Sequence, residues 1–162
     1  MIPKYFLFRA WLYFAAALLI QVTLLPIIAL DGIIPSLWII VLFAFTISEG
    51  KMWGIINAAF FGFVYDLVTS NLIGSSMFAA ATAIYIGGLF LNEQRNEQKL
   101  KSLSFLFILL LVSTVYSIII SLFTNLDIRS SLFTLLLNQG LYQGLYTTAI
   151  GSFVVIFNAR RN

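Results

Sequence analysis

The chain contains no histidine and no cysteine, and charged residues make up only 9% of its 162 residues. The absence of cysteine excludes disulfides and thiolate ligands, and without histidine the usual nucleophile pairs and the imidazole proton switch are also missing. Only six acidic residues are present and they are scattered, so a carboxylate metal site would need ligands from distant segments. We therefore expect no enzymatic activity, no metal and no other cofactor.

Hydrophobic residues, in contrast, make up 61% of the chain, and its mean hydropathy is +1.02. Soluble globular proteins are roughly half apolar, so this excess indicates a membrane protein. A bilayer core needs about 20 apolar residues per helix. Charged clusters and turn residues separate six apolar segments: 6–28, 34–48, 52–69, 74–91, 102–125 and 131–157. We expect one all-α transmembrane domain over residues 1–162, a polytopic bundle of six transmembrane helices.

Segment 34–48 is short for a straight crossing, because about 15 helical residues span only about 22 Å. Two explanations stay open at this stage. Either the bilayer thins locally around this helix, or segments 34–48 and 52–69 form a hairpin that does not cross completely.

The basic residues predict the orientation of the chain. With six crossings, eight of the nine lysines and arginines fall on one side, and Arg129 alone falls on the other. Because cytoplasmic loops are enriched in basic residues, both termini should be cytoplasmic. The net charge of +3 then reflects topology and contact with anionic membrane lipid, and we expect no nucleic-acid partner.

Small residues recur at every fourth position in several segments. Such columns allow close helix packing in membranes. The predicted packing residues are Gly54, Ala58 and Gly62; Ser75, Ala79, Ala83 and Gly87; Ser113, Ser117 and Ser121; Gly140 and Gly144. We expect most of these columns to be interfaces within the bundle and at least one to receive a partner helix. Asn138, Gln139, Tyr142 and Gln143 form a candidate interior polar cluster.

Asp66 lies within the stretch GFVYDLVTSNLIG and is four residues beyond Gly62, so it should face the bundle. Acidic residues in membranes are costly, and a helix C-terminus is an unfavourable place for negative charge. Across the turn, the side chain could accept hydrogen bonds from the free N–H groups where the next helix begins, near Gly74. A partner or ligand contact and a proton or ion relay are the alternatives. We favour the structural role, because no other titratable group lies at that depth.

A motif with the spacing Gly-x-x-x-Asp-Leu, formed by Gly62, Asp66 and Leu67, precedes Leu72-Ile73-Gly74 and a helix that ends in Tyr85-Ile86-Gly87-Gly88. Together with the basic loop after the fourth segment, this arrangement resembles the MreD family of bacterial rod-shape-determining membrane proteins over nearly the whole chain. The resemblance implies a fold similar to the substrate-binding S-components of energy-coupling-factor vitamin transporters.

The resemblance also implies a function. MreD-like proteins are multi-pass inner-membrane subunits of the cell-elongation machinery (the elongasome), which directs lateral peptidoglycan synthesis and maintains rod shape. The implied partner is MreC, a bitopic membrane protein, and the implied neighbours are the RodA glycosyltransferase, its class B transpeptidase and the MreB filament. The alternative is an S-component-like subunit that binds a small vitamin, with a polar pocket from Asp66 and residues 138, 139, 142 and 143.

Overall fold

The computed structural model describes residues 4–29, 33–69, 72–91, 103–124 and 140–159. These residues form six α-helices and one short 3-10 helix. The helices are α1 (Lys4–Thr23), η1 (Leu25–Ile28), α2 (Leu37–Glu49), α3 (Lys51–Thr69), α4 (Ser75–Leu89), α6 (Leu103–Thr124) and α8 (Tyr142–Ala159). The all-α prediction is therefore confirmed.

The helix bounds follow the hydropathy pattern closely in the middle of the chain. Helices α2, α3, α4 and α6 begin and end within three residues of the predicted segments. The first segment, 6–28, divides into α1 and η1, and Pro26 occupies the first turn of η1, where its missing N–H is harmless. The predicted segment 131–157 is described only from residue 140, so its first part lies outside the described residues.

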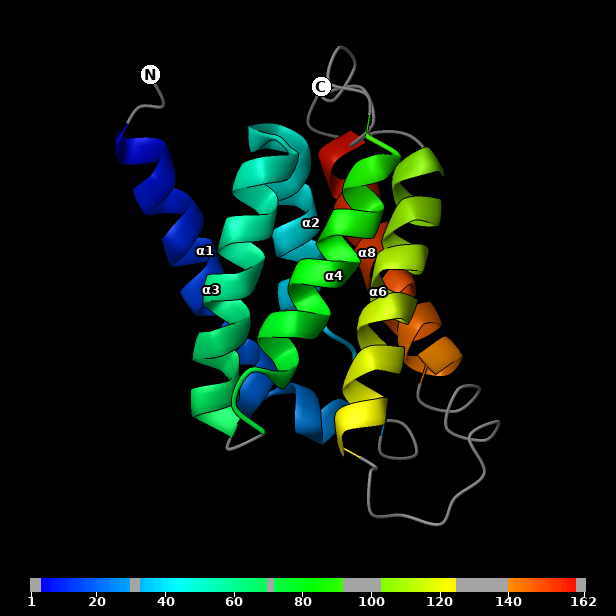
Figure 1. Ribbon diagram of the computed structural model, residues 1–162. Helices are drawn as coiled ribbons and strands as arrows, with labels where there is room; N and C mark the ends of the chain where they lie inside the picture. Colours follow the sequence, from blue (N-terminus) through cyan, green and yellow to red (C-terminus); the bar gives the residue numbers. More distant parts are fainter. Residues whose placement is uncertain (1–3, 30–32, 70–71, 92–102, 125–139, 160–162) are drawn as a thin grey trace.

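Successive helices run in alternating directions, so that α1 begins and α8 ends at the same end of the bundle (Figure 1). The turn between α2 and α3 lies at this end too, whereas the turn between α3 and α4 lies at the opposite end. Figure 1 thus shows an up-and-down arrangement of the described helices.

Helix α2 is at the centre of the bundle and contacts α1, α3, α4, α6 and α8. Its side chains Trp38, Ile39, Leu42 and Phe43 are completely buried and belong to one continuous hydrophobic core. A helix that is apolar on nearly all sides is buried in a protein core or spans a membrane. The other five α-helices bury most, but not all, of the surface of α2.

The small residues lie where helices approach each other most closely. A Cβ atom added at Gly62 would be 2.6 Å from the backbone Cα of Met77 in α4, and one added at Gly54 would overlap Thr46 of α2. The other predicted glycines also lie directly against a side chain of a neighbouring helix: Gly87 against Val112, Gly140 against Ile118 and Gly144 against Thr114. The remaining predicted packing residues are buried: Ala58, Ser75, Ala79, Ala83, Ser113, Ser117 and Ser121. Side chains and backbone of the chain itself therefore fill the faces at these positions, and the expectation that one small-residue column receives a partner helix stays a prediction.

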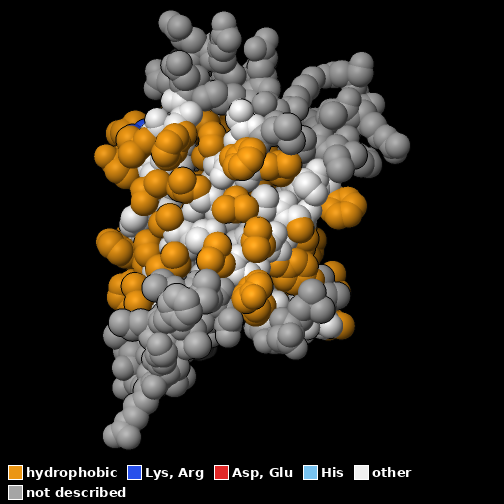
Figure 2. All heavy atoms as spheres, turned by 90° about the vertical axis from the view of Figure 1, so that its right-hand side faces the viewer, with side chains coloured by type: hydrophobic (Ala, Val, Ile, Leu, Met, Phe, Trp, Pro, Cys, Tyr) orange, Lys and Arg blue, Asp and Glu red, His pale blue; other side chains and the backbone are white. Residues whose placement is uncertain are grey.

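The outer surface of the bundle is strongly apolar. Figure 2 shows hydrophobic side chains over the described part of one whole face, and exposed phenylalanines include Phe63, Phe107 and Phe153. Within the described residues, Lys51–Thr69 and Ser104–Phe123 are long and apolar enough to cross a membrane, and the segments Trp11–Ile27, Leu37–Glu49 and Ser75–Leu89 are apolar but shorter. Such surfaces and helices are typical of a membrane protein.

Candidate functional site

The Asp66 carboxylate lies at the end of α3 and accepts hydrogen bonds from the start of α4. The backbone N–H of Gly74 donates to Oδ2 at a distance of 2.8 Å, and the N–H of Ser76 donates to both carboxylate oxygens, each at 3.1 Å. The hydroxyl of Ser75 and the N–H of Met77 make longer contacts of 3.4 and 3.5 Å. These are the N–H groups that a helix leaves without an internal partner, so Asp66 caps α4 from a different helix.

Two glycines make this geometry possible. Gly74 occupies the N-cap position of α4 with φ 94°, a left-handed conformation that glycine adopts without strain. It has no side chain that could cap the helix, and Asp66 supplies the missing acceptor. Gly62, one turn before Asp66, lets the backbones of α3 and α4 approach.

The surroundings of Asp66 are closed and largely aromatic. The side chain is completely buried, and no lysine or arginine in the described residues forms an ion pair with it. Trp38 of α2 stacks on the neighbouring Tyr65 at 5.3 Å between ring centroids and meets the edge of Tyr116 of α6 at the same distance. Leu67, the next residue of the motif, is 56% exposed on the outer surface.

A second group of polar side chains holds the start of α2; we call it the α2 anchor, formed by Gln21 of α1 and Gln143 and Thr147 of α8. Gln21 donates to the carbonyl of Pro35 at 2.9 Å and accepts from the N–H of Leu37 at 2.8 Å. Gln143 donates to the carbonyl of Ile34 at 2.9 Å and to the hydroxyl of Ser36 at 3.2 Å. The Ser36 N–H donates to the hydroxyl of Thr147 at 3.0 Å.

The α2 anchor explains how a short helix fits into the bundle. Helix α2 has 13 residues, which is about 20 Å at 1.5 Å per residue. Residues 33–36 before it are not helical, and in extended form they add up to about 13 Å. Non-helical backbone at membrane depth is tolerated only where protein groups satisfy its N–H and C=O groups. Gln21, Gln143 and Thr147 do so here.

The candidate interior polar cluster is only partly described. Gln143 points inward, as expected, but Tyr142 is 56% exposed, and Asn138 and Gln139 lie outside the described residues. The role of Gln21 was not anticipated. Its signal in the sequence is that it interrupts a long apolar run, which in a membrane helix indicates an inward hydrogen-bonding residue.

The arrangement of these polar side chains suits a structural role better than ligand binding or catalysis. Asp66, which is buried, and Gln143, which is half-buried, both bind backbone groups of the chain itself. Among the described residues no three acidic side chains lie close enough to hold a metal ion.

Comparison with known proteins gives no match to a curated protein and no match to a solved structure. A comparison with protein families matches residues 4–157 to the family described as rod shape-determining protein MreD. The match covers the full set of described α-helices almost to the end of α8, including the Asp66 cap and the α2 anchor. The chain therefore belongs to the MreD family of rod shape-determining proteins.

Proposed function

We propose that this chain is a non-enzymatic scaffold subunit of the bacterial elongation machinery, which binds an MreC-like bitopic partner and supports lateral peptidoglycan synthesis. Family membership gives the role in rod shape. The observation that carries the scaffold proposal is the use of the buried polar side chains: Asp66 and the α2 anchor bind backbone and fix helices in place. Rigid helix faces are what a scaffold offers to its partners.

The vitamin-binding alternative requires free polar groups inside the bundle. Asp66 and Gln143, two of the side chains it would use, already bind backbone groups, and Tyr142 lies on the surface. No observation therefore favours it. A vitamin extracted from the purified protein at one molecule per chain would overturn the scaffold proposal.

The proposal includes six crossings of the inner membrane with both termini in the cytoplasm. Its support is the alternating direction of the helices, the common end of α1 and α8, and the eight basic residues assigned to that side. A cytoplasmic reporter fused after residue 162 should be active and a periplasmic reporter inactive. Activity of the periplasmic reporter at this position would contradict six crossings.

The cellular role is tested by depletion in a rod-shaped bacterium that carries this chain. We expect depleted cells to lose lateral wall synthesis and become round, and the wild-type chain to restore rods. An affinity-tagged chain should retain the MreC-like protein during purification, with RodA, the transpeptidase and MreB as more distant neighbours. Cells that stay rod-shaped after depletion, or a chain that retains no MreC-like protein, would contradict the proposal.

A further inference from the structure

One face of the central helix α2 is only partly covered by the residues that the structure describes. We call it the α2 open face; its residues are Val41, Ala44, Phe45, Ser48 and Glu49. Each of them is half-buried or exposed, whereas the other residues from Trp38 to Ile47 are buried. Positions 41, 45 and 49, with 44 and 48 beside them, form a single stripe along the helix.

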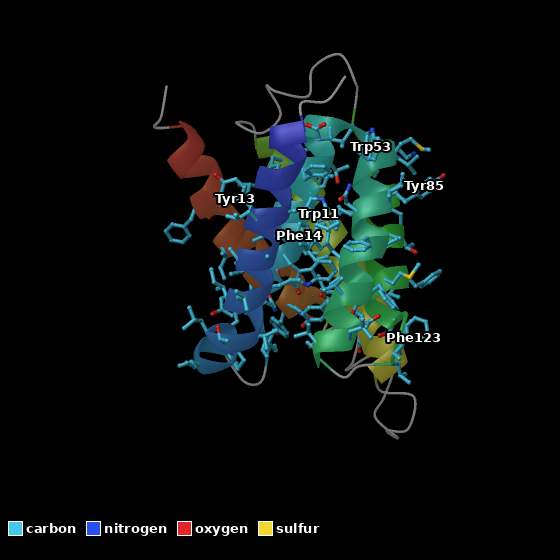
Figure 3. The ribbon with its side chains drawn as sticks, turned by 90° about the vertical axis from the view of Figure 1, so that its left-hand side faces the viewer. Trp11, Tyr13, Phe14, Trp53, Tyr85 and Phe123 are labelled. Atoms are coloured by element: carbon cyan, nitrogen blue, oxygen red, sulfur yellow. The ribbon has the colours of Figure 1, made fainter. Side chains whose placement is uncertain are left out.

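The α2 open face lies between α1 and α8. Phe14 of α1 packs on Trp38, and Gly151 of α8 lies near Ile40, so the two helices flank α2 on either side of the stripe. They make no extensive contact with each other. Figure 3 shows them diverging toward the end at which α1 begins and α8 ends, and it shows Tyr13, which is 65% exposed, on the side of α1 nearer to α8.

The stripe contains both large and small side chains, and its two small residues set it apart from the most exposed parts of α3 and α6. Exposed faces of α3 and α6 carry large side chains such as Phe60, Phe63 and Phe107. The α2 open face carries the small residues Ala44 and Ser48, which allow the backbone of another helix to approach.

A carboxylate marks one end of the stripe. Glu49 is the last residue of α2, at the end of the bundle that holds the α2–α3 turn, and its carboxylate forms no ion pair or hydrogen bond within the described residues. The nearby Lys51 instead places its ammonium group over the ring of Tyr85, 4.3 Å from the centroid. In the proposed orientation this is the cytoplasmic end. A membrane helix with a short cytoplasmic segment carries lysine or arginine there, so its charge is complementary to Glu49.

We propose that the α2 open face binds the single transmembrane helix of a bitopic partner, with the partner's basic cytoplasmic residues beside Glu49 and its membrane helix against Ala44 and Ser48. The inference rests on the proposed scaffold function and specifies which surface performs it. Helices α1 and α8 form the two sides of the site.

The test uses the full-length chain, co-expressed in membranes with the affinity-tagged MreC-like protein of the same organism. Ala44→Trp fills the stripe, and Glu49→Lys reverses its charge. Each should lower the amount of co-purified chain by about tenfold or more, since an excluded helix loses its packing and like charges repel. Ala59→Trp, at another half-buried alanine on α3, is the matched control and should leave the amount unchanged. Thermal unfolding of each variant alone should match that of the wild type.

Crosslinking distinguishes the possible occupants, because the chain has no native cysteine. Ser48→Cys should form a disulfide with cysteines placed along the partner's membrane helix, and Ile56→Cys on the exposed face of α3 should not. If the partner co-purifies with Ala44→Trp and Glu49→Lys as well as with the control, the α2 open face is the wrong surface and the scaffold function stands. If Ser48→Cys links only to a second copy of the chain, the assigned occupant is wrong. If the wild-type chain retains no partner at all, both proposals fail.

Discussion

Replacing Asp66 tests whether the buried carboxylate acts through its shape or through its charge. Asp66→Asn keeps one acceptor oxygen, which can remain at the Oδ2 position and accept from Gly74 and Ser76. It loses the second contact to Ser76, at a cost of about 1 kcal/mol. Asp66→Leu has a similar branched shape but no acceptor. The N–H groups of Gly74 and Ser76 then lack a partner, at about 1–3 kcal/mol each, or about 2–6 kcal/mol together.

Thermal unfolding in detergent, followed by circular dichroism, measures this difference. Since 1 kcal/mol shifts the unfolding temperature of a chain of this size by about 2–4 °C, Asp66→Leu should unfold at least about 4 °C below the wild type, and Asp66→Asn much closer to it. Co-purification with the MreC-like partner should follow stability. Equal unfolding temperatures for the two variants would refute the capping role. An Asp66→Asn protein that is stable, abundant and without its partner would show that the charge serves binding.

Substitutions at three further positions test the contacts around the two polar sites, and the same unfolding assay measures each variant. Gly62→Ala should lower the free energy of unfolding by about 1–3 kcal/mol, because the added Cβ would meet the backbone of α4, which cannot rotate away as a side chain can. A variant as stable as the wild type would mean that α3 and α4 can move apart at little cost. Gly74→Val should lower the free energy of unfolding by about 1–3 kcal/mol, because a φ of 94° strains a β-branched residue. Gly74→Asn should be nearly neutral, because asparagine tolerates this conformation. Equal losses of stability in the two variants would point to a steric cause instead. Thr147→Val should lower the free energy of unfolding by about 1–3 kcal/mol, because it removes the acceptor of the Ser36 N–H. Thr147→Ser keeps the hydroxyl and should retain the stability of the wild type. If the two variants are equally stable, this hydrogen bond does not contribute to stability.

Hydropathy and spacing were sufficient to predict the helices and the Asp66 cap. A run of apolar residues long enough for a helix stands out directly, and Asp66 and Gly74 are close enough in sequence that a single turn brings them together. The α2 anchor was not predictable in this way, because Ser36 and Thr147 are 111 residues apart and meet only in the folded bundle. Spacing alone also cannot identify the neighbour of a small-residue column: Gly140 and Gly144 permit close packing, and only the folded bundle shows that Ile118 and Thr114 of α6 lie against them.

The distribution of hydrogen bonds is compatible with the proposed binding of a partner helix to the α2 open face. The Asp66 cap joins α3 to α4 near the end of the bundle opposite the chain termini, and the α2 anchor joins α1 and α8 through the start of α2. Toward the other end, where α1 and α8 diverge, the α2 open face is partly exposed, and no hydrogen bond among the described residues links the two helices there (Figure 3). A helix that enters from this end gains packing against Ala44 and Ser48 and leaves the anchored end intact. If the proposal is correct, such a helix mainly displaces lipid from this face, so small residues and a carboxylate that has no partner among the described residues would suffice as a recognition surface.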